Sequence, residues 1–348
     1  MKVEEKYMAR SLELAASGSG QVAPNPMVGS VIVCHEKIIG EGYHRKYGGP
    51  HAEVNAIKAV QVPEMLKEST LYVTLEPCAH HGQTPPCSDL IIEKKIPRVV
   101  IGTSDPFSEV AGKGIEKLQK AGVEVETDVL QRECRELNKR FFTFHEKKRP
   151  FVILKWAQTL DGFIDIPRDP EAFGQPTWIT GDLALELVHK IRAGEGAILV
   201  GTRTAQKDNP SLTVRRWTGD NPLRAVIDRN LRLPPNLNLL DNSTPTLVFN
   251  AKKNSFSNNT AFVKIDFNRN ILPQILTELY RKNILSVIVE GGFHLLESFF
   301  SAGLWDEAHV FIGDRFFFNG QKAPALRGKL TASETLGSDR LKIFRNDA

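Results

Sequence analysis

The chain has 348 residues, 41% of them hydrophobic and 25% charged, and a formal net charge of +4. This length suits two domains, and the composition is typical of soluble globular proteins. No apolar run approaches the roughly 18–20 residues that span a bilayer, and the N-terminus has no signal-peptide pattern. We therefore expect a cytoplasmic protein with no membrane partner. The basic residues are scattered, which disfavours a nucleic-acid binder and favours an enzyme that acts on a small molecule.

Strands and helices alternate along the first half of the chain. Residues 4–17 have the spacing of an amphipathic helix, and the apolar runs 28–34 and 38–41 flank a polar turn, which predicts a hairpin. The elements expected after these are helices at 51–60, 87–94, 113–121 and 130–139 and strands at 71–75, 98–102 and 123–125. This alternation predicts a layered α/β sheet.

A charged stretch that ends in proline, at 147–150, marks the predicted boundary between two domains, 1–147 and 148–348. A surface loop within one domain is the alternative. The elements expected in the second half are strands at 151–156, 197–201, 224–228, 286–290 and 307–312 and helices at 182–193, 271–282 and 293–301. Residues 229–260 are rich in Asn and Pro and predict mostly loop, and the C-terminal end has no readable pattern.

The residues that carry chemistry in the first half are His51, Glu53, Cys78 and Cys87. His51 and Glu53 begin a helix, whereas the two cysteines each follow a proline in a polar loop. A zinc deaminase needs three protein ligands and one open position for a water molecule, whose pKa the metal lowers toward neutrality. It also needs a carboxylate that is not a ligand and that carries the proton to the ring nitrogen and the leaving amine. His51 and the cysteines would supply ligands, and Glu53 the proton shuttle.

The spacing of these residues leaves the third ligand open. The general deaminase signature is His-x-Glu followed by Pro-Cys-x-x-Cys, but here the third residue after Cys78 is His81. Either His81 is the third ligand, or Cys87 is the ligand at the end of an enlarged loop, or these residues are unrelated and no metal binds.

The second half contains one local signal, a predicted strand at 286–290 that is followed by Gly291-Gly292 and a helix. Glycines at this place let a phosphate approach the backbone N–H groups of a helix N-terminus. A plain helix start is the alternative. No G-x-G-x-x-G follows the first strand of this half, which disfavours a dinucleotide-binding fold of the Rossmann type.

Longer motifs in both halves resemble a single family. They are the segments 24–29, 40–44, 50–53, 74–87, 105–106 and 110–114 in the first half and 154–162, 178–180, 198–202, 208–212 and 289–292 in the second. In these segments the chain resembles the bifunctional deaminase–reductase family of riboflavin biosynthesis. The resemblance implies an α/β protein in which an N-terminal cytidine-deaminase-like three-layer α/β/α domain precedes a C-terminal dihydrofolate-reductase-like α/β domain.

The resemblance also implies roles for single residues. In the deaminase domain, it implies zinc (Zn²⁺) held by His51, Cys78 and Cys87, Glu53 as proton shuttle, and Asn25 and His44 as substrate-binding residues. The residues implied to line NADPH in the reductase domain are Gln158, Trp178, Thr204, Asp208, Arg229, Gly292, Phe293, His294, Leu295, Leu296, Glu297 and Ser298. Those implied to face the substrate there are Pro176, Arg192, Leu212, Arg215 and Glu290. The two arginines suit a phosphate, since guanidinium is the preferred phosphate partner.

Four residues depart from the family's usual pattern. Gln83 replaces a basic residue, which bears on how the substrate phosphate is gripped. Pro176 stands where a hydroxyl residue is frequent, and Gln158 where a small residue is usual. Arg229 replaces a small hydroxyl residue, and we hypothesise that it pairs with the 2′-phosphate of NADPH, as an arginine does in other dinucleotide sites.

The resemblance therefore predicts a two-step enzyme that acts as a homo-oligomer. In the first step, water would displace the 2-amino group of 2,5-diamino-6-(phosphoribosylamino)pyrimidin-4-one and leave a uracil-type ring. In the second step, NADPH would deliver hydride to C1′ of the ribose and give a ribityl chain. Two rival interpretations are a nucleic-acid deaminase, which predicts a basic groove with aromatic stacking residues, and a catalytically inactive regulator that binds a metabolite.

Overall fold

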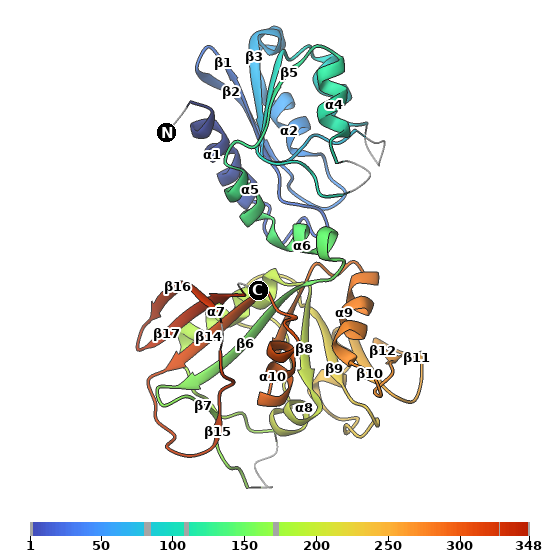
Figure 1. Cartoon of the computed structure of the whole chain (residues 1–348), viewed down its shortest axis with the longest axis vertical. Helices are drawn as coiled ribbons and strands as arrows, with labels where there is room; N and C mark the ends of the chain where they lie inside the picture. The colour runs from blue at the N-terminus through green and yellow to red at the C-terminus, as the bar shows by residue number, and fades with distance from the viewer. Residues whose placement is uncertain (1–2, 80–84, 108–110, 170–173, 327, 347–348) are drawn as a thin grey trace. The chain divides into compact units, whose positions relative to one another are not determined.

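The computed structural model describes residues 3–79, 85–107, 111–169, 174–326 and 328–346, so His81 and Gln83 lie outside the described residues. The chain divides into two compact units, Met1–Lys148 and Arg149–Ala348 (Figure 1). In the described part of the chain, no helix combines the length and the apolar character that crossing a bilayer requires.

The described residues of the first unit contain α-helices, one 3-10 helix (Pro63–Glu68) and strands. The helices are α1 (Val3–Ala16), α2 (Ala52–Ala59), α3 (Cys87–Glu93), α4 (Lys113–Lys120), α5 (Gln131–Leu137) and α6 (Lys139–Lys147). The strands are β1 (Gly29–Cys34), β2 (Lys37–Tyr43), β3 (Ser69–Val73), β4 (Arg98–Ile101) and β5 (Glu124–Glu126).

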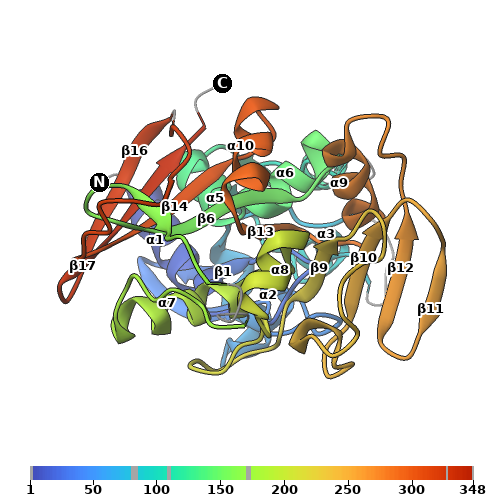
Figure 2. The same cartoon turned by 90° about the horizontal axis from the view of Figure 1, so that it is seen from below.

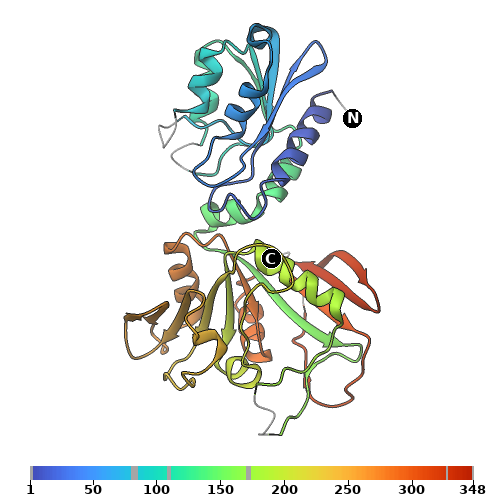
Figure 3. The same cartoon turned by 180° about the vertical axis from the view of Figure 1, so that it is seen from behind.

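These strands form one sheet in the order β2-β1-β3-β4-β5, in which β3, β4 and β5 run parallel. The predicted hairpin joins β1 and β2, and its turn residues His35 and Glu36 have positive φ angles, which match the twist of the two strands. Successive strand residues point to opposite faces, so Val31 packs with α1 and α5 while Ile32 packs with α2, α3 and α4 (Figures 1 and 3). The predicted α/β/α layering of this domain is confirmed.

The second unit has a larger set of described elements, with one 3-10 helix at Asn238–Leu240. Its helices are α7 (Asp182–Gly194), α8 (Thr202–Asp208), α9 (Ile271–Arg281) and α10 (Phe293–Ser301). Its strands are β6 (Phe151–Thr159), β7 (Phe163–Asp165), β8 (Ala197–Gly201), β9 (Leu223–Ile227), β10 (Thr246–Asn250), β11 (Ser255–Ser257), β12 (Thr260–Lys264), β13 (Ser286–Glu290), β14 (Glu307–Gly313), β15 (Gln321–Lys322), β16 (Lys329–Leu336) and β17 (Asp339–Arg345).

The main described sheet of this unit has the order β11-β12-β10-β9-β8-β13-β6-β14-β17-β16. The strands from β12 to β14 in this order run parallel, and antiparallel strands close both edges. Both faces of the central strands are buried: Leu199 belongs to a core with α9 and α10, and Val200 to a second core on the opposite face (Figure 2). This two-sided burial explains the continuous apolar runs in the sequence.

The prediction of mostly loop over 229–260 holds for most of this range, but it missed the strands β10 and β11. Strand β10 lies in the middle of this range, pairs in parallel with β9 and β12, and is buried along its whole length. A run of five residues after a proline is too short for its periodicity to show which structure it forms, and its partners settle the outcome. The C-terminal end, which had no readable pattern, forms the hairpin β16–β17, and β17 pairs with β14.

The helix predicted over 130–139 is confirmed as α5, but it ends at Leu137, and a second helix that was not predicted, α6, begins after Asn138. The side chain of Asn138 donates to the backbone carbonyl of Met27 and accepts from its N–H, each at 2.8 Å. This pairing holds the loop that contains Asn25 against the break between the helices, so the break has a structural use.

Candidate active sites

The structure brings His51, Cys78 and Cys87 together, with one ligand atom of each lying within 4.8 Å of the others. Nδ1 of His51 is 3.6 Å from Sγ of Cys78 and 3.3 Å from Sγ of Cys87. Two ligands at ordinary zinc distances of about 2.0–2.3 Å and a tetrahedral angle are about 3.5 Å apart, so this cluster has the dimensions of a zinc site. An imidazole nitrogen and two sulfurs also form a donor set that zinc prefers, with a fourth position left for water.

Two members of the cluster lie at helix starts, and the third, Cys78, lies in the loop between β3 and α3. His51 is the N-cap residue of α2, and Cys87 is the first residue of α3. The backbone N–H of Cys87 donates to Sγ of Cys78 at 3.3 Å, and the N–H of Ser88 donates to the carbonyl of Cys78 at 3.2 Å. The first turn of α3 therefore holds the Cys78 loop in place and directs positive helix-end dipoles toward its sulfur.

The electrostatics of the cluster favour the metal-binding form of Cys78. The hydrogen bond from Cys87, aided by His51, lowers the pKa of the Cys78 thiol to about 4. The hydrogen bond to Cys78 raises the pKa of His51 to about 9. A thiolate is the form of cysteine that binds metals. Because the pKa of Cys78 is about 4, Cys78 has this form at neutral pH.

Glu53 lies in the first turn of α2, two residues after His51, and its side chain is buried. Burial raises the pKa of Glu53, and its carboxyl group is within hydrogen-bonding reach of Cys87. The proposed shuttle is thus a carboxyl group beside the cluster.

Asn25 and His44 also lie next to this cluster. The Nδ2 atom of Asn25 is 3.2 Å from Nε2 of His44, and Nδ1 of His44 is 3.0 Å from the carbonyl oxygen of Pro50. The His44 ring meets the His51 ring edge-on, with 5.6 Å between the centroids. The two residues implied to bind the substrate therefore form a hydrogen-bonded pair at the edge of the metal cluster.

Glu76 was not singled out from the sequence. Among the described residues of the loop that carries Cys78 (the metal loop), its side chain makes the most hydrogen bonds. Its buried carboxylate accepts backbone hydrogen bonds at 2.9–3.3 Å. The donors are the N–H groups of Asp105, Gly112, Gly114 and Ile115. A Cβ atom on Gly114 would collide with the carbonyl oxygen of Pro77, so glycine permits this close approach. A glutamate directly before Pro77-Cys78 was the only sequence signal.

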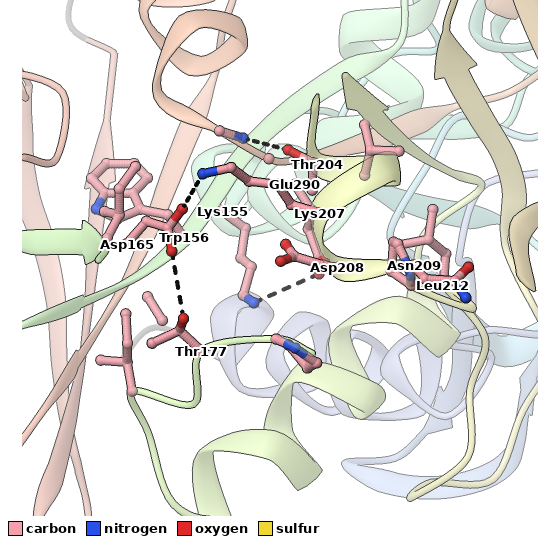
Figure 4. Close-up of a pocket in the computed structure, with 18 of the residues that line it drawn as sticks. Lys155, Trp156, Asp165, Thr177, Thr204, Lys207, Asp208, Asn209, Leu212 and Glu290 are labelled. Carbon is pink, nitrogen blue, oxygen red and sulfur yellow. Dashed lines mark hydrogen bonds and ion pairs between the residues drawn. The ribbon is translucent and has the colours of Figure 1, made fainter. Parts of the chain in front are cut away.

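In the second unit, a cavity of about 580 Å³ opens at the carboxyl ends of β6, β8 and β13. Ligands bind at this edge of open parallel sheets. Figure 4 shows Lys155 and Trp156 from β6, Thr204 and Asp208 from α8, and Glu290 from β13 around this space. The residues implied by the resemblance that line it are Pro176, Trp178, Arg192, Thr204, Asp208, Leu212, Arg215, Glu290, Gly292, Phe293 and His294.

The other residues assigned to the cofactor do not line this cavity. Gln158 accepts a hydrogen bond from Nε1 of Trp156 at 2.8 Å, and the guanidinium of Arg229 lies 5.6 Å from the ring centroid of Phe267. Leu295 and Leu296 pack in the core with β13, and Glu297 and Ser298 follow on α10. Because a helix turns 100° per residue, only part of a continuous run such as 292–298 can face one space.

Glu290 forms ion pairs at the floor of the cavity. Its carboxylate is 2.8 Å from Nη2 of Arg192 and 3.7 Å from Nζ of the buried Lys155. Although burial opposes ionisation, the charges of Arg192 and Lys155 lower the pKa of Glu290 to about 2. This end of the cavity therefore carries a fixed negative charge between two cations.

A second group of ion pairs lies across the cavity, on α8 and the strand β7. Arg168 contacts Asp208 at 2.7 Å and Asp165 at 2.8 Å, and Lys207 contacts Asp165 at 3.1 Å.

Some residues that line the cavity were not singled out from the sequence, namely Lys155, Asp165, Arg168 and His189. A charged residue inside the apolar run 151–156 was a signal for Lys155, and the one-turn spacing from Arg192 was a signal for His189.

Two family models match the chain. Residues 1–103 match the model described as the cytidine and deoxycytidylate deaminase zinc-binding region. This matched segment contains His51, Cys78 and Cys87. Residues 150–341, more than half of the chain, match the model described as the RibD C-terminal domain.

Whole-length relatives agree with these matches. The riboflavin biosynthesis protein RibD of Aquifex aeolicus is 39% identical over 361 residues and covers 99% of each chain, and that of Escherichia coli is 36% identical, covering 90% of this chain and 88% of its own. A crystal structure from Thermotoga maritima, of a diaminohydroxyphosphoribosylaminopyrimidine deaminase/5-amino-6-(5-phosphoribosylamino)uracil reductase, has a TM-score of 0.88 at 38% identity and covers 99% of both chains. Acinetobacter baumannii RibD has a TM-score of 0.88 at 32% identity, with the same coverage.

The cluster, the cavity and these likenesses lead to one assignment. The zinc cluster lies in the part that matches the deaminase model, and the cavity lies in the part that matches the RibD reductase. The chain belongs to the RibD family and is a bifunctional enzyme of riboflavin biosynthesis, with a zinc-dependent deaminase domain followed by an NADPH-dependent reductase domain.

Proposed function

We propose that the first domain removes the 2-amino group of 2,5-diamino-6-(phosphoribosylamino)pyrimidin-4-one by hydrolysis, and that the second domain reduces the ribosyl chain of the product to a ribityl chain. The observation that carries the first step is the cluster of His51, Cys78 and Cys87 with the buried Glu53 beside it. The deaminase and reductase activities of the Thermotoga maritima protein support the same pair of substrates.

In the deaminase domain, His51, Cys78 and Cys87 would hold zinc, which when bound acts as a Lewis acid and lowers the pKa of a water molecule toward neutrality. Glu53 takes a proton from the attacking water and delivers it to the ring nitrogen next to the reacting carbon and then to the leaving amine. Asn25 and His44 orient the pyrimidine ring, since their hydrogen-bonded pair lies at the edge of the cluster. Water enters and ammonia leaves, so the step needs no other reactant.

In the reductase domain, Trp178, Thr204, Asp208 and the turn 292–294 would bind NADPH, which when bound supplies the hydride. Glu290 and the lining residues Pro176, Leu212, Arg192 and Arg215 would bind and orient the substrate. Orientation is the chief contribution of the chain itself, because holding C1′ near the donor replaces a bimolecular encounter. The further assignments to the cofactor, Gln158, Arg229, Leu295, Leu296, Glu297 and Ser298, remain predictions.

Mass spectrometry of the diaminopyrimidine compound after incubation with the enzyme tests the proposal. Without NADPH, replacement of an amino group by oxygen should add about 1 Da. With NADPH, reduction should add about 2 Da more. Removal of zinc by a chelator should abolish the first gain and spare the second when the deaminated compound is supplied. Full ammonia release by a metal-free preparation would refute the zinc assignment.

The proposal includes a cytoplasmic location and a homo-oligomer. The family resemblance supports both expectations. Light scattering coupled to size exclusion should give a mass that is a multiple of 38.8 kDa, and a monomer at micromolar concentration would contradict the oligomer.

A further inference from the structure

His189 lies on α7 one turn before Arg192, is buried, and lines the reductase cavity, yet none of the roles above uses it. Its Nδ1 atom accepts the backbone N–H of Arg215 at 3.1 Å. A neutral imidazole has one nitrogen that accepts and one that carries a proton. The ring is therefore held in the tautomer with the proton on Nε2, which makes Nε2–H a donor.

The groups around His189 keep the ring neutral. Burial lowers its pKa to about 4, together with the positive charges of Arg192, Arg215 and Arg216, while Glu290 opposes the shift. A cationic ring would be repelled by these guanidinium groups. A neutral N–H donor avoids this repulsion and still presents a hydrogen to an anion in the cavity.

Each nitrogen of the Arg192 guanidinium already donates one hydrogen bond within the protein. Its Nε and Nη2 atoms donate to Glu290 at 3.3 and 2.8 Å, and Nη1 donates to the carbonyl of Thr213 at 3.4 Å. In contrast, within the described part of the chain the Arg215 guanidinium makes one hydrogen bond, from Nη1 to Oγ1 of Thr213. Arg215 and His189 therefore offer donors to a ligand at this end of the cavity.

We propose that His189 donates its Nε2–H to the phosphate monoester of the substrate and, with Arg215, forms the phosphate-binding end of the reductase cavity; this inference rests on the proposed function. A phosphate dianion suits two N–H donors among clustered guanidinium groups. The 2′-phosphate of NADPH has the same chemistry, so the test has to separate the two sources.

The variants His189→Asn and His189→Gln isolate the Nε2–H. Asparagine keeps an acceptor near the position of Nδ1 but has no group at Nε2, whereas the longer glutamine amide places an N–H near Nε2. The measurement is kcat and KM of the reductase for the deaminated substrate and for its dephosphorylated counterpart, at saturating NADPH. Asparagine should raise KM for the phosphorylated substrate by about 10-fold or more, as expected for a hydrogen bond to a charged group. It should change kcat and the KM of the dephosphorylated compound by less than about 2-fold, and glutamine should restore most of the loss.

Two outcomes would overturn the role. An equal rise of KM for both substrate forms in both variants would show that His189 only packs the cavity wall. A rise of KM for NADPH, without a rise for NADH or for the substrate, would assign the contact to the 2′-phosphate instead. The kcat of each variant with the dephosphorylated compound serves as the folding control, because it depends on an intact reductase domain.

A measurement on the wild-type enzyme is independent of variant folding. The ¹⁵N chemical shifts of His189 should show the Nε2–H tautomer, and titration with ribose 5-phosphate should shift Nε2 more than Nδ1. An Nδ1–H tautomer, or no response to ribose 5-phosphate, would reject the inference. A wild-type enzyme that fails to reduce the deaminated compound would refute the proposed function, while the tautomer result would stand on its own.

Discussion

The two sites of this enzyme are built on opposite plans. In the deaminase domain, two side chains at helix starts and one in a loop place their ligand atoms within 4.8 Å of one another, and short stretches of chain position each of them. In the reductase domain, a cavity of about 580 Å³ is lined from many elements, and its charges are paired across the space. The small site needs a few residues in the correct places, whereas the large one needs the whole sheet to assemble.

The difference extends to what each site does with charge. The deaminase cluster gathers hydrogen-bonded thiols and an imidazole, and so prepares a place for a cation. The reductase cavity instead holds a carboxylate between Arg192 and Lys155 and leaves donors on Arg215 and His189 for an anion. Substitutions should therefore affect the first site through proton transfer and metal affinity, and the second through ion-pair stability and substrate binding.

The largest expected effect is that of Glu53→Gln. A glutamine cannot carry protons from water to the ring and the amine, so the deamination rate should fall by about 10²–10⁴-fold. Ammonia release measures the loss, and reduction of the deaminated compound should stay unchanged. The zinc content measured by mass spectrometry should also match the wild type, because Glu53 is not a ligand. A variant with near-normal ammonia release would remove Glu53 from the mechanism.

The second effect concerns the ion pairs of the cavity. The pKa of Glu290 is lowered to about 2 from an ordinary value of 4.5, so its ionised form stabilises the fold fully above pH 4.5 and loses this contribution as the pH falls toward 2. Glu290→Gln should lower the free energy of unfolding by up to about 3 kcal/mol at neutral pH and by progressively less below pH 4.5.

Urea unfolding of the wild type and Glu290→Gln between pH 2.5 and 7 checks this expectation. The difference in unfolding free energy should shrink as the medium becomes more acidic. A difference that is independent of pH would mean that the ionised carboxylate is not the source of the stabilisation.

The third effect concerns the contribution of Glu76 to zinc binding by the metal loop. Glu76→Gln leaves one acceptor oxygen, so some of the backbone N–H groups that contact the carboxylate would face an amide NH₂. Zinc affinity should fall by about 10–100-fold, as for other groups that support metal ligands. Competition with a chromophoric chelator measures the affinity, and Glu116→Gln, on the exposed side of α4, is the matched control. Equal affinities in the two variants would limit Glu76 to a structural role.

The smallest effect is expected for Arg229→Ala. Arg229 does not line the cavity, and an exposed contact with a phosphate is worth about 1 kcal/mol or less. The preference for NADPH over NADH, measured as a ratio of kcat/KM values, should therefore fall by no more than about 5-fold. An unchanged ratio would exclude Arg229 from the cofactor site.

Much of the deaminase site could be predicted, because its signals are local. His51 and Glu53 share a helix start, and the prolines before Cys78 and Cys87 mark the loop that carries them. The choice between His81 and Cys87 was not decided by spacing alone, and the structure brings Cys87 to His51. Glu76 could not be foreseen, because its partners lie about 30 to 40 residues further along the chain.

The sequence by itself determined the alternation of strands and helices, the hairpin of β1 and β2, and the roles of His51, Glu53 and Cys78 in the deaminase site, since periodicity, turn chemistry and ligand identity are properties of short segments. Only the tertiary structure decided that residues 246–250 form a buried strand, that Arg192 is paired with Glu290, and that His189 accepts a hydrogen bond from Arg215. Each of these depends on partners 20 to 100 residues away, and no local pattern records which distant groups a folded sheet will bring within hydrogen-bonding distance.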